Sequence, residues 1–249
     1  MKKKKILRDI GILLSLFVGV LIFYAYYPVD ETEIETTNYI DKEADIKDRL
    51  IKLMNYKAAG SDDSELMKTL GNIQNLIQDS DFSYQLYLSN SKEINIYSLP
   101  GNMIVVNRGL IQMCETPEEL IGVIAHGVGH LKQNHISEKF KKNLEIELLL
   151  DSSNISIAEV SELLNNNSFV VGNENEADEY VINKLKELNI SPSTLADLYK
   201  RLYTKSDIIP DFLTTHPGLN GRISRLSKFD NTLINRNYGF DWDKVKASL

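Results

Sequence analysis

Histidine is scarce and clustered in this 249-residue chain. Three of its four histidines fall within ten residues, at His126, His130 and His135. His126 and His130 are four residues apart, so on a helix both imidazoles lie on one face and can reach one metal ion. Pairs at this spacing also occur on ordinary surfaces and in cores. Gly127 and Gly129 favour a metal site, because each glycine costs a helix about 1 kcal/mol relative to alanine and packing alone has no need of them.

The residue after the first histidine is decisive for chemistry. Catalytic zinc helices carry H-E-x-x-H, whose glutamate is the general base, whereas this chain reads AHGVGH, with Gly127 in the glutamate's place. Bound zinc still lowers the pKa of its water toward about 7, but glycine cannot carry a proton. Loss of a general acid–base group typically costs about 10²- to 10⁴-fold in rate. The pattern therefore predicts a zinc site with absent or severely weakened hydrolysis.

A zinc site needs further ligands, and the stretch GNENEADEYVINKLKEL supplies two carboxylates at helical spacing, Glu174 and Asp178. Glu174 can complete a set of two histidines and one glutamate, which is known for catalytic zinc with water in the fourth position. Asp178, one turn along, can accept a hydrogen bond from a ligand histidine and fix its tautomer. The alternative is that both acids belong to a solvated helix face.

No other acid is expected to replace the missing glutamate. Glu119 and Glu118 precede His126 by seven and eight residues, which is about 10 Å along a helix at 1.5 Å per residue and too far for direct proton transfer. Glu176 lies about 200° around its helix from Glu174 and should point away from the metal.

The elements that must position these residues follow from periodicity. Thr116, Pro117 and Glu119 mark the start of the histidine helix as N-cap, first helical residue and capping-box partner. Apolar residues at helical spacing predict packing helices within 39–58 and 63–80. β-Branched and aromatic residues predict strands in 83–89 and 94–111, the second broken by Pro100-Gly101-Asn102. We therefore expect a predominantly helical α+β fold with a sheet of about three strands.

The N-terminus has the composition of a membrane anchor. Residues 10–27 carry no charge over 18 residues, close to the length of a membrane-spanning helix. Five of the 28 basic residues precede them, which predicts a basic cytoplasmic tail over 1–9. A cleaved signal peptide is the alternative, but we find no convincing small-x-small cleavage site. A polar linker over 28–39 and a domain over 40–249 are expected outside the cytoplasm, in a periplasm or its equivalent.

Charge and cysteine content exclude other classes. The net charge is −7 although basic residues gather at the N-terminus, which argues against a nucleic-acid surface. The single cysteine, Cys114, excludes an intrachain disulfide and a CxxC zinc site.

Four blocks of the sequence carry a family pattern. NIYSLPGNMIVVNRGLI resembles N-x-F-x-x-P-G-G-x-I-x-V-x-x-G-L, with Asn102 in place of the second glycine. EELIGVIAHGVGH resembles D-E-L-A-x-V-L-A-H-E-x-x-H, ENEAD matches E-x-x-A-D, and THPGLNGRISRL resembles H-P-x-x-x-x-R-I-x-x-L. In this order, from Asn95 to Leu226, the blocks resemble the HtpX-like and CAAX-prenyl-protease-like zinc metallopeptidases, a gluzincin group.

The resemblance implies a zincin-like fold and a role for each matched residue. By it His126, His130 and Glu174 bind Zn²⁺, Asp178 supports them, His216 approaches the reacting carbonyl of the substrate, and Arg222 supports the site. His135 matches no family ligand and is expected to lie at a helix end.

It also implies a membrane-anchored zinc metalloendopeptidase that hydrolyses misfolded or membrane-associated polypeptides, disabled here at Gly127. The substrate is expected to add as a strand along a sheet edge near Ile104 to Asn107. The alternatives are a noncatalytic, zinc-stabilised module that binds unfolded polypeptides, and a metal-free helical scaffold.

Overall fold

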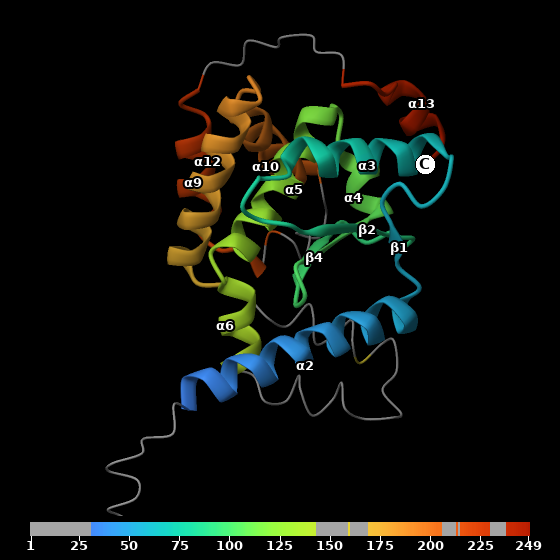
Figure 1. Ribbon diagram of the computed structural model, residues 1–249. Coiled ribbons are helices and arrows are strands. Elements are labelled where there is room, and N and C mark those ends of the chain that lie inside the picture. The colour runs from blue at the N-terminus through green and yellow to red at the C-terminus, as the bar shows by residue number, and fades with distance from the viewer. Residues whose placement is uncertain (1–30, 143–158, 160–168, 206–212, 214, 230–237) are drawn as a thin grey trace, which may run out of the picture. The chain divides into compact units, whose positions relative to one another are not determined.

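The computed structural model describes residues 31–142, 159, 169–205, 213, 215–229 and 238–249. Contacts divide the chain into two units, residues 1–42 and 43–249, and the sheet and the histidine cluster belong to the second. The elements are α2 (Glu31–Met54), β1 (Lys57–Ala58), α3 (Glu65–Ile77), β2 (Gln85–Ser89), β3 (Ile96–Leu99), β4 (Met103–Asn107), α4 (Arg108–Met113), α5 (Pro117–Lys132), α6 (His135–Lys142), α9 (Val171–Glu187), α10 (Ser193–Lys205), α12 (Leu219–Leu226) and α13 (Trp242–Ala247) (Figure 1). The predicted α+β class with a predominance of helix is confirmed.

The sheet is mixed and has the strand order β1-β2-β4-β3. Strands β2 and β4 are parallel, while β1 and β3 pair antiparallel with their neighbours. The predicted turn is confirmed, with positive φ at Gly101 and Asn102, and four strands replace the expected three because the two-residue β1 is too short to leave a pattern. Residues 108–111, expected in a strand, begin helix α4.

The strand order corrects one functional expectation. Strand β4 pairs with β2 on one side and β3 on the other, so the expected substrate edge near Ile104 to Asn107 is wrong. The edge strands of the described sheet are β1 and β3, and β3 is the one that packs against α5.

The sheet separates two apolar clusters. Ile104 and Val106 of β4 pack into a cluster with α3 and α5, whereas Met103 and Val105 pack with Leu50 of α2. Every residue of β4 is buried, which explains its unbroken apolar run. In Figure 1, α5 runs between α9 and the sheet.

Helix α5 begins where the sequence predicts. The Thr116 hydroxyl accepts a hydrogen bond from the Glu119 amide at 3.4 Å, and Pro117 is the first helical residue. The Glu119 carboxylate accepts instead from the Glu115 amide, at 2.6 Å, and pairs with Arg201. The reciprocal half of the capping box is therefore shifted by one residue.

A glycine sets how closely α5 and α9 approach. A methyl group at Gly129 would lie 3.0 Å from the carbonyl oxygen of Ala177 and 3.1 Å from its Cα. Helix α9 thus crosses α5 at a place where only hydrogen fits. The expectation that packing has no need of the two glycines is wrong for Gly129, because close helix packing is its role.

The N-terminal expectations are only partly covered. Residues 1–27, with the predicted tail and anchor, lie outside the described residues. Among the helices that the structure describes, none combines the length and the apolar character needed to cross a membrane. Helix α2 begins at Glu31, so most of the predicted linker over 28–39 is helical. Acidic residues in a first helical turn are stabilised by the helix dipole, which favours this start.

Replacing Gly129 should test the helix contact. Gly129→Ala is expected to lower the free energy of unfolding by about 1–3 kcal/mol, because the methyl group meets the backbone of α9. Gly221→Ala on α12 is the matched control, since nothing lies within 4 Å of its added methyl group and the change should stabilise by up to about 1 kcal/mol. Urea unfolding measures both, and equal effects would contradict the assignment.

Candidate metal centre

Four buried side chains from three parts of the chain meet at one place. His126 and His130 come from α5, Glu174 from α9, and His216 precedes α12; one potential ligand atom from each lies within 4.8 Å of the others. The Nε2 atoms of the two α5 histidines are 3.1 Å apart. Each lies 3.3 Å from a different oxygen of Glu174. The structure therefore brings together every residue that the sequence suggested as a metal ligand, and adds His216 to the group.

The donor set fits a divalent cation. Both Glu174 oxygens are buried, and within the described structure neither has a hydrogen bond of acceptable geometry, although Arg222 Nη1 lies 2.7 Å from Oε2. A buried acceptor without a hydrogen bond is costly. Two imidazole nitrogens and a carboxylate oxygen are ordinary zinc ligands, so a metal ion between them would satisfy these atoms.

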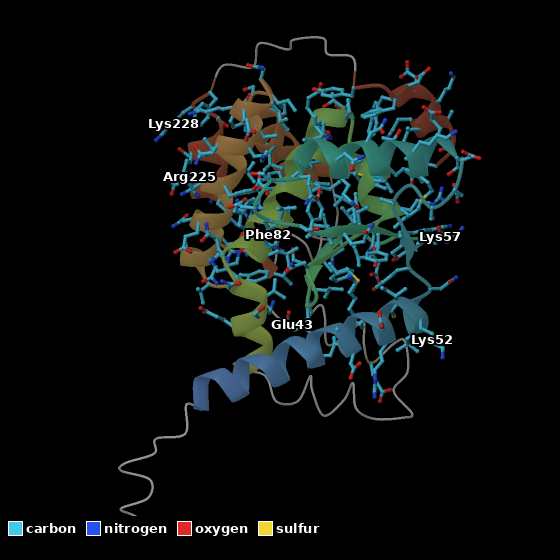
Figure 2. All side chains as sticks on the ribbon, viewed as in Figure 1. Glu43, Lys52, Lys57, Phe82, Arg225 and Lys228 are labelled. Atoms are coloured by element: carbon cyan, nitrogen blue, oxygen red, sulfur yellow. The ribbon has the colours of Figure 1, made fainter. Side chains whose placement is uncertain are left out.

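Asp178 orients the first histidine. Its Oδ1 lies 3.2 Å from His126 Nδ1, the nitrogen that faces away from Glu174. Arg222 donates two hydrogen bonds to the same carboxylate, from Nε to Oδ2 at 2.9 Å and from Nη2 to Oδ1 at 2.8 Å. Arg225, labelled in Figure 2, adds a third at 2.9 Å. With its Nδ1 hydrogen held by Asp178, His126 presents the Nε2 lone pair to the cluster.

His135 is a partner of His130 that sequence reasoning missed. It begins α6, at a helix end as expected, and its Nδ1 lies 3.1 Å from His130 Nδ1. Its Nε2 lies 3.1 Å from Glu176, an acid that is not part of the converging ligand group. The sequence signal for this contact is Asn134, because asparagine tolerates a positive φ well. In the structure Asn134 has a φ of 58° and turns the chain back after α5.

An aromatic ring covers the second histidine. Phe169 stacks on His130 with ring centroids 3.9 Å apart, and its amide donates to the Thr215 carbonyl at 2.9 Å. The His216 ring lies 5.3 Å from the rings of both α5 histidines, and its Nδ1 is 3.0 Å from the Thr215 hydroxyl. Among the described residues, the Phe169 ring therefore covers the cluster on the side of His130.

Burial and charge set the protonation of the cluster. Burial lowers the pKa of His130 to about 3 and that of His216 well below its usual range. Burial and Arg222 also oppose protonation of His126, but Asp178 and Glu174 outweigh them and raise its pKa. Despite their burial, the pKa values of both carboxyls are lowered by the neighbouring imidazoles, and that of Asp178 also by Arg222. At neutral pH the carboxylates and the neutral His130 and His216 offer lone pairs to a cation.

Gly127 lies in a filled space. A methyl group there would be 3.0 Å from both Ile104 Cδ1 and Ser98 Oγ. The Ser98 hydroxyl also donates to the Gly127 carbonyl at 3.1 Å. The nearby acids are engaged elsewhere, Glu118 with Tyr238 and Glu119 with Arg201, so they do not replace a glutamate at this position.

Acid should destabilise the metal-free protein. Between pH 6.5 and about 3 the unfolded chain binds a proton at His130 that the folded chain does not, so the free energy of unfolding falls as the pH drops through this window. His216 acts in the same direction, as do Glu174 and Asp178 below about pH 5; only His126 opposes. We expect a lower Tm at pH 5 than at pH 7 after chelation. His130→Phe should flatten this dependence, and a flat profile in the unaltered chain would contradict it.

Removal of the His135 contact should weaken metal binding without abolishing it. Supporting residues of this kind typically contribute about 10- to 100-fold to metal affinity, so His135→Phe should raise the Kd for zinc by that factor, measured by chelator competition. Glu176→Gln should act in the same direction, whereas Glu179→Gln, on the exposed side of α9, is the control. Glu174→Ala should remove the bound metal, and an unchanged zinc content would contradict the site.

Comparison with known proteins agrees with this geometry. The family described as peptidase family M48 matches residues 67–230. The chain is 25% identical over 219 residues to the beta-barrel assembly-enhancing protease of Yersinia pestis, covering 78% of this chain and 45% of that protein. It is 27% identical over 177 residues to the metalloprotease LoiP of Escherichia coli K12, with coverages of 63% and 68%. It is 28% identical over 152 residues to the mitochondrial metalloendopeptidase OMA1 of Arabidopsis thaliana, with coverages of 59% and 31%.

The chain therefore spans less than half of the first relative and about two thirds of the second. Because the family match covers more than half of its residues and contains the whole histidine and glutamate cluster, the chain belongs to peptidase family M48.

Proposed function

We propose that this chain is a membrane-anchored zinc metalloendopeptidase-type protein whose proteolysis is absent or severely weakened by Gly127. His126, His130 and Glu174 are the proposed zinc ligands, supported by their convergence and burial. The observation that carries the proposal is that this otherwise complete donor set has a hydrogen atom where the pattern requires a carboxylate.

The side chains divide the remaining work. When bound, zinc supplies a Lewis acid and a water of lowered pKa. Asp178 holds the proton on Nδ1 of His126, and Arg222 holds Asp178 in place. In this proposal His216, which lies within reach of the same point, contacts the reacting carbonyl of a substrate. The missing step is proton transfer from water to the leaving amine, for which Gly127 has no group.

The proposed substrate is an extended segment of a misfolded or membrane-associated polypeptide. Strand β3 pairs with β4 on one side, and its Ser98 contacts the helix at Gly127. A peptide that adds to the other side of β3 by main-chain hydrogen bonds would pass close to the metal ligands. The edge of β3 thus takes the role first expected of Ile104 to Asn107.

The proposed location is a single membrane with the peptidase domain on the extracytoplasmic side. It rests on the uncharged run over 10–27 and the basic residues before it. Extraction of the full chain into carbonate at alkaline pH would contradict an anchor.

A noncatalytic function is the second candidate. In it, the zinc-stabilised domain holds unfolded polypeptides without cutting them. The filled space beside Gly127 favours it, as does Phe169 stacked on His130, because both restrict what can approach the metal.

Restoring the carboxylate separates the two candidates. Gly127→Glu should raise chelator-sensitive peptide hydrolysis by about 10²- to 10⁴-fold, and combining it with Ser98→Ala removes one atom that the new side chain would meet. Gly127→Gln, of the same shape without acid–base function, is the matched control and should stay inactive. A folded, zinc-loaded Gly127→Glu protein that cuts nothing would favour the noncatalytic candidate. An unaltered chain that cuts as fast as the restored one would refute the disabled site.

A further inference from the structure

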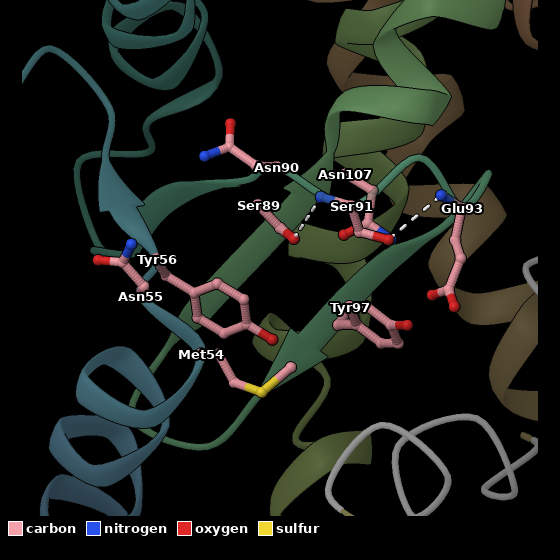
Figure 3. Close-up of a pocket in the computed structure, with 9 residues that line it drawn as sticks. All are labelled: Met54, Asn55, Tyr56, Ser89, Asn90, Ser91, Glu93, Tyr97 and Asn107. Atoms are coloured by element: carbon pink, nitrogen blue, oxygen red, sulfur yellow. Dashed lines mark hydrogen bonds between the residues drawn. The ribbon is translucent and has the colours of Figure 1, made fainter. Parts of the chain in front are cut away.

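A polar cavity lies on the other side of the sheet from the histidine and glutamate cluster. Its volume is about 270 Å³, several times the roughly 30 Å³ that one water occupies in the liquid. It is lined by the end of α2 and the two residues after it, the ends of β2 and β4, the loop that leads into β3, and β3 itself (Figure 3). The main lining side chains are Met54, Tyr56, Ser89, Glu93, Tyr97 and Asn107.

Asn107 is the unusual member of this lining. It is 1% exposed, and neither its amide nitrogen nor its amide oxygen has a hydrogen-bond partner among the described residues. It occupies the N-cap position of α4, yet its side chain makes no capping hydrogen bond, although asparagine is among the best capping residues. The Asn107 side chain therefore does not cap the helix. It lies in the cavity wall, where its NH₂ group and its oxygen both lack hydrogen-bond partners within the described structure.

Tyr56 repeats the pattern on the opposite wall. The residue is 6% exposed, and its hydroxyl likewise lacks a partner in the described structure. Buried polar groups are normally hydrogen-bonded, and each one left unsatisfied costs about as much as a lost hydrogen bond. Three buried polar atoms on two residues that line one cavity thus lack partners within the described structure.

The cavity is formed in advance by its own loop. The Ser89 hydroxyl accepts from the Ser91 amide, and the Ser91 hydroxyl accepts from the Glu93 amide, both at 3.2 Å, as the dashed lines in Figure 3 show. The Ser91 carbonyl in turn accepts from the Gly109 amide at 3.1 Å. These bonds fix the loop without using Asn107 or Tyr56.

The lining selects the chemistry of the ligand. The Asn107 carboxamide offers donors on its NH₂ group beside an acceptor oxygen, so its complement is another amide group. Among the described residues of the lining, Glu93 is the only charged one and no lysine, arginine or histidine accompanies it, so an anion is disfavoured. The rings of Tyr56 and Tyr97 add faces that attract cations.

We propose that this cavity binds an amide adjacent to a protonated amine, the chemistry of the amino-terminal unit of a peptide and of a free amino-acid amide. The ligand amide pairs with Asn107 and Tyr56, and the ammonium group lies toward Glu93 and the tyrosine rings. The site uses the face of the sheet opposite to the metal ligands, so it stands independently of the proposed peptidase function.

Titration of the 249-residue chain with glycinamide tests this directly. The side-chain NH₂ resonances of Asn107, assigned from their loss in Asn107→Leu, should shift saturably in ¹H–¹⁵N spectra. N-Acetylglycinamide lacks the charge and ethylamine lacks the amide, so both should bind more weakly. Triglycine amide separates the sources: binding like glycinamide indicates a peptide terminus, and its exclusion indicates a free amino-acid amide.

Two variants guard against misfolding as an explanation. Asn107→Leu, followed by the shifts of neighbouring resonances, should weaken glycinamide binding at least about tenfold while leaving the ligand-free protein no less stable, because it removes unsatisfied polar atoms. Glu93→Gln changes an exposed side chain and should weaken glycinamide about three- to fivefold without affecting N-acetylglycinamide.

Three results would overturn the proposal. Asn107 resonances unmoved by glycinamide would mean that the cavity holds water only. Equal shifts with ethylamine would remove the amide from recognition. Destabilisation by Asn107→Leu would show that the Asn107 amide is already satisfied without a ligand.

Discussion

The close crossing of α5 and α9 is the constraint on which the metal cluster depends. Gly129 meets the backbone of Ala177, and each of these residues directly precedes a member of the site, His130 and Asp178. The helix contact and the ligand geometry are therefore one feature. A wider crossing would move the α9 carboxylates away from both imidazoles, whose reach is limited by short side chains.

This crossing buries charge, and the structure balances it locally. Glu174 and Asp178 are fully buried, as is Arg222 except for 2% of its surface. A buried ion pair stabilises only when its geometry is good and its other atoms are satisfied. Asp178 meets that condition with Arg222, Arg225 and His126, whereas Glu174 lacks well-formed hydrogen bonds. The arrangement is thus complete around the supporting carboxylate and incomplete around the ligand carboxylate, as expected where folding and metal binding are coupled.

What could be predicted from the sequence was local. The start of α5 follows from Thr116 and Pro117, and the shared helix faces of His126 with His130 and of Glu174 with Asp178 follow from spacing alone. Strand order is not local. The interior position of β4 depends on its parallel pairing with β2, and no local sequence pattern predicts that pairing. The His135 contact depends on the backbone turn at Asn134, and the role of Gly129 on a helix about fifty residues away. The sequence places Asn107 in a strand, where it does lie, but no sequence pattern predicts that its side-chain amide lacks hydrogen-bond partners.

In the proposed function, a side chain at residue 127 is needed for proton transfer but for neither peptide binding nor metal binding. Main-chain pairing along β3 needs an open strand edge, and the metal ligands need α5 and α9; neither needs a side chain at residue 127. Ile104 and Ser98 pack toward the space that a side chain would enter, and the Ser98 hydroxyl bonds to the Gly127 carbonyl. Glycine at this position therefore supplies no proton carrier, while the hydrogen bond from Ser98 to its carbonyl joins the sheet to the helix. In the proposed function, such a domain keeps a strand edge for an extended chain beside the histidine and glutamate cluster, and Gly127 supplies no group that could complete cleavage.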